Sequence, residues 1–246
     1  MEQRKSAELP RSMALAWGVA ERGSRGPKRA LTIDRIVAAG IEIAAGDGLG
    51  AVSMARVAER LGVSTMALYR YVESKDDLLE LMVDAAIGPP PRARPGESWR
   101  DGMRRWAEGV RDGYRANQWA LRVPISGPPL GPNNMRWMEA ALAALRDTPL
   151  SVPDRLSCLL TVVGFVRSEE LLLADLTDGQ RAGRDPRDYA VHLARLVNPH
   201  DFPEICAALT SGNLDDEDDI DHDFEFGIER ILDGIEMLIA REEEDG

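Results

Sequence analysis

The chain contains few of the residues that build redox sites, metal sites and membrane spans. Its 246 residues include two cysteines and three histidines, and aromatic side chains make up 5% of the total. Because Cys158 and Cys206 lack a CxxC spacing, we expect no disulfide framework and a reducing environment. No apolar run approaches the roughly 20 residues that a membrane-spanning helix needs. The N-terminal residues do not resemble a signal peptide either, so we expect a cytoplasmic protein with no membrane partner.

Motifs of the common enzyme classes are also missing. We find no nucleophile elbow, no HExxH sequence, no phosphate-binding loop and no glycine-rich dinucleotide fingerprint. The acidic run from Asp215 to Asp223 lacks the glycine and the closing glutamate of an EF-hand loop, and we interpret it as a solvated loop. We therefore expect a protein that is not an enzyme and has no cofactor and no metal site.

Charge is distributed unevenly along the chain. The formal net charge is −12, which is unfavourable for binding an anionic partner. Residues 22–75, however, hold nine Lys and Arg against five Asp and Glu, whereas the chain from His200 onward holds seventeen Asp and Glu against two Arg. A basic N-terminal region with an acidic C-terminal region favours binding of one end to phosphates.

Apolar residues recur with the 3.6-residue period of a helix, and two-residue alternation is not found, so the fold class is all-α. We interpret residues 1–30 as a basic, mostly disordered arm with room for one helical turn around Met13 to Val19, and residues 31–88 as a three-helix DNA-binding domain. The segment Gly88-Pro89-Pro90-Pro91 interrupts any helix and marks a boundary. Residues 97–246 then form a larger helical domain, with amphipathic stretches at about 98–117, 133–146, 153–176, 185–196 and 223–241.

Residues 53–72, SMARVAERLGVSTMALYRYV, have the pattern of a helix-turn-helix. Ser53 and Ser64 are good N-caps for two short helices, and Gly62 supplies the turn between them. Thr32 and Ser74 are N-caps of the helices before and after this pair. The apolar inner face consists of Val57, Leu61, Val63, Leu68 and Val72.

The opposite side of the second helix points away from the domain and is expected to enter the major groove. There Arg70 can bind guanine O6 and N7, Thr65 can hydrogen-bond a base, and Met66 and Ala67 can contact a thymine methyl group. Four further residues are better placed to contact phosphates, and they are Ser53, Ser64, Tyr69 and Lys75. The first N–H groups of the helix that begins at Lys75 would bind the same phosphate as Lys75.

Residues 32–86 closely resemble the DNA-binding domain of the TetR family of transcriptional regulators. The matching residues are IVAA at 36–39, GL at 48–49, VAERLGV at 57–63, LYRYV at 68–72 and KDDLL at 75–79. The last helix, FEFGIERILDGI at 224–235, resembles the C-terminal domain of the tetracycline-repressor-like branch. The resemblance implies a homodimeric repressor that binds a palindromic DNA operator and is released by a small-molecule inducer. It also places Thr65 to Ala67 and Tyr69 to Tyr71 at DNA and Lys75 at a phosphate.

Several expectations for the rest of the chain leave two interpretations open. Lys28 and Arg29 either reach an adjacent minor groove or belong to a solvated tail. The aromatic cluster is either the lining of a ligand pocket or plain core, and it consists of Trp106, Tyr114, Trp119, Trp137 and Met138. An apolar set on two helices is either a dimer interface or core, and it consists of Leu159, Val163, Val166, Phe224, Ile228, Ile231, Ile235 and Leu238.

Two general alternatives complete the predictions. A helical adaptor that binds protein instead of DNA would share the same pattern of helices. A magnesium–tetracycline site cannot be transferred from the family, because the three histidines, His192, His200 and His222, all lie late in the chain. The inducer is therefore unknown.

Overall fold

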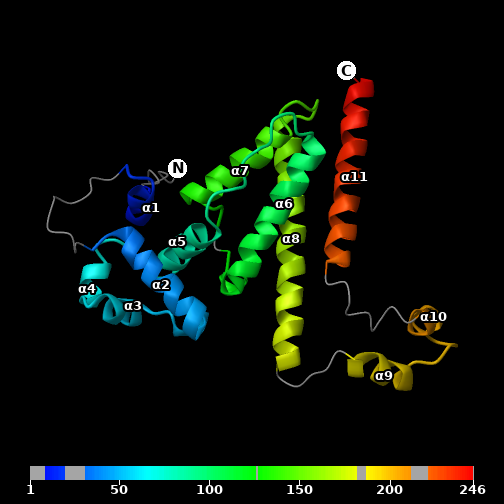
Figure 1. The fold of residues 1–246 in the computed structure, drawn as a ribbon, viewed down its shortest axis with the longest axis horizontal. Coiled ribbons are helices and arrows are strands. Elements are labelled where there is room, and N and C mark those ends of the chain that lie inside the picture. Colours follow the sequence, from blue (N-terminus) through cyan, green and yellow to red (C-terminus); the bar gives the residue numbers. More distant parts are fainter. Residues whose placement is uncertain (1–8, 20–30, 126, 182–186, 212–220, 246) are drawn as a thin grey trace, which may run out of the picture. The chain divides into compact units, whose positions relative to one another are not determined.

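The computed structural model describes residues 9–19, 31–125, 127–181, 187–211 and 221–245, and these residues form helices and no strand (Figure 1). The predicted all-α fold class is confirmed. No helix in these ranges combines the length and the apolar composition needed to cross a membrane. The elements are α1 (Arg11–Ala16), α2 (Ile33–Asp47), η1 (Leu49–Ala51), α3 (Met54–Leu61), α4 (Thr65–Leu68), α5 (Lys75–Ile87), α6 (Trp99–Ala116), η2 (Gln118–Arg122), α7 (Pro132–Ala144), α8 (Val152–Arg181), α9 (Arg187–Leu196), α10 (Pro203–Ser211) and α11 (His222–Asp245).

Side-chain caps fix the starts of three N-terminal helices where the sequence predicts them. The hydroxyl of Thr32 accepts a hydrogen bond from Arg35 N at 3.3 Å, that of Ser53 from Arg56 N at 3.2 Å, and that of Ser74 from Asp77 N at 3.0 Å. Each bond satisfies one N–H group that the first helical turn leaves without a partner. The helix boundaries in this region therefore follow from local sequence.

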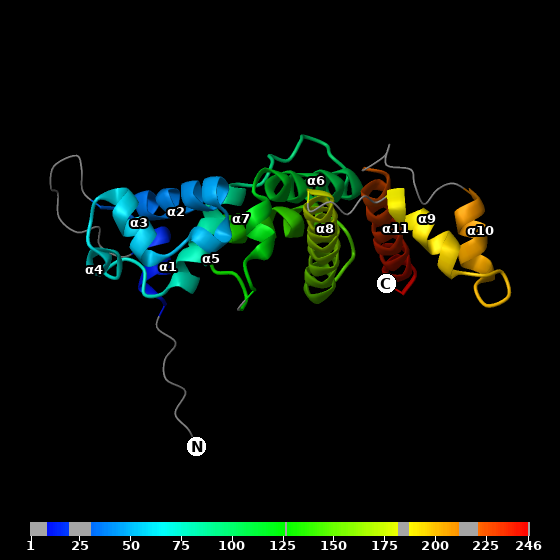
Figure 2. The ribbon, with the colours of Figure 1, turned by 90° about the horizontal axis from the view of Figure 1, so that it is seen from below.

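The N-terminal helices pack around α2, which contacts α3 and α5 (Figures 1 and 2). The core between them contains Ile36, Ile43, Val57, Leu68 and Leu78, all of them fully or almost fully buried. Where α5 approaches α2, a Cβ atom on Gly40 would lie 2.6 Å from Sδ of Met82, so the end of that side chain would have to shift. Helix α5 is thus closely packed against α2.

Helix α1 contributes to this core. Its Met13 and Ser12 are buried, and the helix packs against α2 and α5. Residues 11–16 thus form a helix that overlaps the segment where the sequence allows one helical turn. The remainder of the arm, including Lys28 and Arg29, lies outside the described residues.

The chain divides into two compact units, residues 1–148 and 149–246. The proline-rich segment at 88–91, where the sequence predicts a domain boundary, lies inside the first unit because α5 packs against both α6 and α7. Trp106 and Trp137 reinforce the contact of α6 with α7, since their rings meet edge to face with centroids 5.7 Å apart. The helices that follow the prolines are thus joined to the DNA-binding helices.

In the second unit, α8 and α11 pack side by side and run in opposite directions (Figure 1). The rings of Phe165 and Phe224 stack between them at 5.9 Å. A Cβ atom on Gly227 would lie 2.3 Å from Cζ of Phe165, so glycine is needed for this close approach. Helix α10 was not among the predicted helices. Its nine residues pack mainly against α9 within the described part of this unit.

Candidate nucleic-acid interface

Helices α3 and α4 form the predicted helix-turn-helix. Gly62 ends α3 in the left-handed conformation, with φ of 68°, which glycine adopts at little cost. Val57 and Ala58 of α3 and Leu68 and Val72 at the end of α4 are buried. The inner face of the second helix is therefore fixed to the core, and its outer face is free.

The outer face of α4 is exposed to solvent. Met66 is 73% exposed, Tyr69 and Arg70 are exposed, and Thr65 and Ala67 are half-buried. Arg70 makes no hydrogen bond or ion pair with any residue that the structure describes. An exposed methionine on α4, with an exposed tyrosine and an unpaired arginine directly after the helix, is suited to base edges and phosphates, and not to packing within the chain.

Two other arginines of this region form ion pairs that join α3 to α2. Arg56 contacts Asp47 at 3.1 Å, and Arg60 contacts Glu42 at 3.0 Å. All four side chains are about half exposed, so each pair contributes about 0–1 kcal/mol to stability. These pairs leave Arg70 and Lys75 as the unpaired cations beside α4 within the described residues.

Tyr71 does not belong to the exposed face. Its hydroxyl donates a hydrogen bond to the carbonyl oxygen of Leu31 at 2.9 Å, and its side chain is half-buried. This bond ties the segment after α4 to the segment before α2. The contact of Tyr71 with DNA, which the resemblance to the family implies, stays a prediction.

The serines and the lysine predicted to contact phosphates lie at helix starts. Ser64 precedes α4, is exposed, and its hydroxyl makes no capping bond. The Ser53 hydroxyl accepts the Arg56 N–H and still has its own proton to donate. Lys75 is exposed at the first position of α5, where the helix dipole also favours an anion.

The predicted aromatic cluster is mostly core. The indole N–H of Trp106 donates to the carbonyl oxygen of Trp137 at 2.8 Å, and that of Trp137 donates to Gly88 at 2.8 Å. Tyr114 is buried and Met138 half-buried. Trp119 differs, because it is 9% exposed and its Nε1 has no hydrogen-bond partner among the described residues. Of these five residues, only Trp119 thus has a buried donor without a partner among the described residues.

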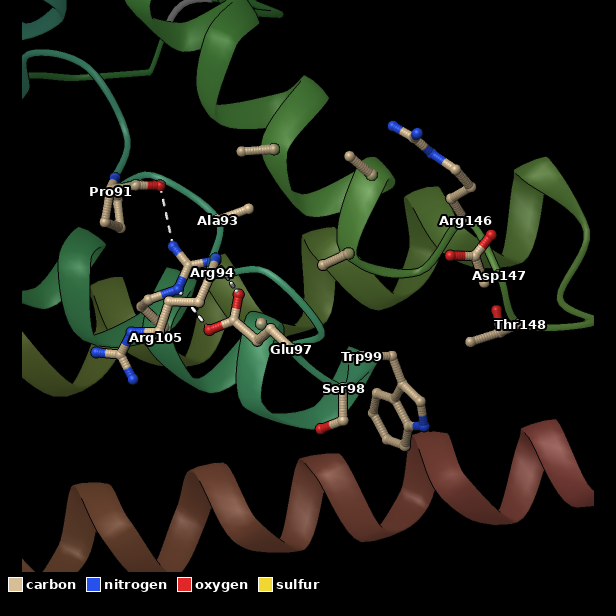
Figure 3. A pocket seen from close by; sticks show the side chains of 14 residues that line it. Pro91, Ala93, Arg94, Glu97, Ser98, Trp99, Arg105, Arg146, Asp147 and Thr148 are labelled. Atoms are coloured by element: carbon tan, nitrogen blue, oxygen red, sulfur yellow. Dashed lines mark hydrogen bonds and ion pairs between the residues drawn. The ribbon is translucent and has the colours of Figure 1, made fainter.

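A surface hollow of about 450 Å3 lies elsewhere, between the segment before α6 and the end of α7 (Figure 3). It contains none of the five predicted pocket residues. Arg105 crosses its floor, donating to Glu97 at 2.7 Å and to the carbonyl oxygen of Pro91 at 2.9 Å. The hydrogen bond from Arg105 holds the pKa of Glu97 below its ordinary value, and the same bond raises the pKa of Arg105. The pair fixes the proline-rich segment against α6.

Most of the residues predicted for the dimer interface are buried within one chain. Leu159 and Val166 of α8 and Phe224, Ile228 and Ile235 of α11 are buried where these two helices meet. Val163, Ile231 and Leu238 are half-buried. Five of the eight residues are therefore covered within one chain, whereas Val163, Ile231 and Leu238 keep part of their surface; the dimer interface stays a prediction.

Sequence reasoning missed the polar contacts that join α5 to α7. Asp84, near the end of α5, is 4% exposed, and its two carboxyl oxygens accept hydrogen bonds from Asn133 and Asn134. Trp17 of α1 also donates to the carbonyl oxygen of Leu130 at 2.8 Å. The one available signal was an aspartate in the last turn of a helix, where the dipole disfavours a negative charge.

Comparison with known proteins supports this geometry. Residues 36–82 match the model of "Bacterial regulatory proteins, tetR family", and residues 91–239 match "Tetracyclin repressor-like, C-terminal domain". The HTH-type transcriptional repressor DrrR1 of Streptomyces coeruleorubidus is 36% identical over 247 residues, which cover 96% of this chain and 88% of that protein.

Solved structures of ActR from Streptomyces coelicolor are also similar. Apo ActR superposes with a TM-score of 0.71 at 28% identity, over 91% of this chain and all of ActR. ActR in complex with actinorhodin gives 0.69 at 28% identity, over 83% of this chain and 96% of ActR. The family models together cover most of the chain, and a repressor is similar over nearly its full length. The chain therefore belongs to the TetR family, and it is a DNA-binding transcriptional regulator of the ligand-responsive repressor type.

Proposed function

We propose that two copies of this chain bind a palindromic operator, with one α4 in each of two successive major grooves. The observation that carries the proposal is the outer face of α4, where Met66, Tyr69 and Arg70 are exposed above a buried Leu68. Two half-sites on one side of a duplex are about 34–36 Å apart. A two-fold dimer matches such a site, and its DNA target places the protein in the cytoplasm.

Within each half-site the residues divide between bases and backbone. Arg70 forms a bidentate pair with a guanine, Thr65 hydrogen-bonds a base, and Met66 and Ala67 contact a thymine methyl group. The backbone residues, Ser53, Ser64, Tyr69 and Lys75, bind phosphates and fix the register of the helix. Arg70 is assigned to a base because it is exposed and unpaired, whereas Arg56 and Arg60 are held by carboxylates of α2.

The dimer forms through the sides of α8 and α11 that remain exposed. Leu160 of α8 is 65% exposed, and Met237 and Phe226 of α11 are 61% and 57% exposed. Three large apolar side chains in solvent on two packed helices favour association with a second copy. Light scattering at micromolar concentration should give the mass of a dimer, and Leu160→Glu with Met237→Glu should shift it to a monomer.

The inducer is a ligand with a hydrogen-bond acceptor that the indole N–H of Trp119 can bind. A buried N–H without a partner costs about 1–3 kcal/mol, and a ligand would recover this cost. ActR, which has a similar fold, was crystallised with actinorhodin. Actinorhodin is therefore the first probe: it should weaken operator binding by the wild-type protein, and Trp119→Phe, which lacks only the donor, should reduce this effect.

The central experiment is a selection of binding sites from a random DNA duplex library, repeated with Arg70→Ala. We expect a palindrome, in which the variant relaxes one position per half-site and loses about 1–3 kcal/mol of discrimination there. Arg60→Ala is the matched control, because it removes an arginine that is paired with Glu42 of α2, and it should leave the selected sequence unchanged. Recovery of no sequence at low salt would contradict the proposal.

A further inference from the structure

The joint between α5 and α7 contains a buried acidic side chain that no step of DNA binding uses. Asp84 lies in the last turn of α5, close to the carboxyl end of that helix. A negative charge is disfavoured there by the helix dipole, and burial of a carboxyl group adds a further cost. A residue that destabilises its own helix is expected to make a compensating contact outside that helix.

Asp84 acts as the missing N-cap of α7. Gly131, at the N-cap position, has no side chain to offer, and Pro132 has no N–H. The carboxyl oxygens of Asp84 instead accept the backbone N–H groups of Asn133 at 3.2 Å and of Asn134 at 2.7 Å. They also accept the Asn134 side-chain amide at 2.8 Å. One side chain of α5 thus satisfies the free donors of another helix and meets the positive end of its dipole.

The reverse contacts hold the carboxyl end of α5. The side-chain amide of Asn133 donates to the carbonyl oxygen of Asp84 at 3.0 Å, and Trp137 donates to that of Gly88 at 2.8 Å. Asn117, just before η2, donates to Ala86 at 3.2 Å. Carbonyl groups that the end of a helix leaves free are therefore bound by side chains from α7 and from the residue that follows α6.

There is no space in this joint for adjustment. A Cβ atom on Gly131 would lie 2.2 Å from Oδ1 and 2.8 Å from Cβ of Asp84. The backbone of Gly131, with φ of −65°, suits any residue, so contact with Asp84 is the constraint. A displacement of α7 must therefore either move α5 or break several buried hydrogen bonds.

We infer that Asp84 is a positioning residue through which α7 fixes α5, and that movement of α7 reaches the DNA-binding helices through its carboxyl group. Helix α5 is suited to this role because Lys75 begins it, its middle packs against α2, and its last turn carries Asp84. Its 13 residues span about 20 Å. The inference rests on the proposed function, since it concerns how a ligand-responsive repressor transmits a change to its operator.

The test compares operator binding and amide hydrogen exchange in the full-length protein. Asp84→Asn keeps the size of the side chain but places an NH2 group against one of the donors of α7. Gly131→Ala leaves Asp84 intact and forces the joint apart. Glu139→Gln, which removes one exposed charge from the same helix α7, is the matched control.

In the wild type, the selected operator should slow exchange at α3 and α4 and also at Asn133 and Asn134. In Asp84→Asn and Gly131→Ala we expect the response of α7 to be lost, the protection of α3 and α4 to remain, and operator affinity to fall about tenfold. The base preference should be unchanged, in contrast to Arg70→Ala. Glu139→Gln should behave as the wild type.

Other outcomes overturn the inference. If both joint variants lower only the melting temperature, with affinity and the response of α7 retained, Asp84 is merely a structural cap. If the wild type protects α3 and α4 on DNA but shows no response in α7, operator binding stands and transmission through Asp84 fails. Should Asp84→Asn not fold, Gly131→Ala, which leaves Asp84 intact, carries the test, and a full α7 response in that variant contradicts the inference.

Discussion

The outer face of α4 and the joint between α5 and α7 both contain polar side chains, but these differ in exposure and in hydrogen bonding. Directly after α4, Tyr69 and Arg70 are exposed, and Arg70 has no partner within the described residues. At the joint, Asp84 is buried and accepts three hydrogen bonds. Exposed polar groups without partners are available to a ligand such as DNA, whereas buried and paired polar groups fix one arrangement of two helices.

The same difference separates the arginines of the first unit. Arg56 and Arg60 form exposed pairs that contribute little, whereas Arg105 and Glu97 form a pair whose side chains are 16% and 7% exposed. Removal of one partner from a largely buried pair leaves the other without full compensation. Substitutions should therefore change DNA binding on α4 and change stability at the buried contacts.

The largest effect is expected beneath the outer face of α4. Leu68→Ala removes a fully buried side chain and should lower the free energy of unfolding by about 2–5 kcal/mol. Met66→Ala, two residues away and exposed, should change it by no more than about 0.5 kcal/mol. Urea denaturation followed by circular dichroism measures both. Equal losses in the two variants would show that the two faces of α4 do not differ as described.

Glu97→Gln should have the next largest effect on stability. The hydrogen bonds from Arg105 to Glu97 are lost or weakened, which should cost about 1.5–3 kcal/mol at pH 7. Because the pKa of Glu97 in the folded protein lies below its ordinary value of 4.5, its contribution is complete above that value. The contribution is lost as the pH falls through the lower pKa of the folded state.

Urea denaturation of both proteins between pH 7 and pH 3 measures this dependence. The difference in unfolding free energy between the wild type and Glu97→Gln should be constant down to about pH 5 and should narrow below it. Asp112→Asn, an exposed substitution on the same helix α6, is the control and should give a small difference at every pH. If the difference in unfolding free energy grew as the pH fell, the ion pair between Glu97 and Arg105 would not be the cause of the stabilisation.

Local signals account for what the sequence predicted well. The caps Thr32, Ser53 and Ser74 and the turn at Gly62 each act within a few residues, so the helix-turn-helix and its exposed side chains could be placed from sequence. An apolar stripe, in contrast, does not say which surface covers it. The sequence left Phe224 and Ile228 open between a dimer interface and core, and in the structure α8 of the same chain packs against their helix and both side chains are buried.

Contacts between distant residues could not be predicted from the sequence. Asp84 and Asn134 are 50 positions apart, and Trp17 and Leu130 are 113 apart. Neither pair has a spacing that a helix or a turn imposes. The buried polar joint is therefore a property of the tertiary packing of α5 against α7, and it became visible only with the structure.

A smaller effect on DNA binding is expected at the start of α5. Lys75→Ala should weaken binding to all duplexes to a similar extent and reduce the slope of log affinity against log salt by about one. Arg60→Ala, which removes a cation already paired with Glu42, is the control and should change the slope less. Titration of a labelled duplex at several salt concentrations measures both. An unchanged slope for Lys75→Ala would remove Lys75 from the phosphate contacts.

The smallest effect, and the one that best sharpens the comparison, is expected at Trp17. Its indole N–H donates to Leu130 at 2.8 Å, but the side chain is exposed, so water can replace the bond. Trp17→Phe should therefore lower the unfolding free energy by only about 0.5 kcal/mol, although the bond connects α1 to the segment before α7. If the loss instead reached that of Glu97→Gln, α1 would be an essential part of the joint, and pairing of polar groups would matter there more than their burial.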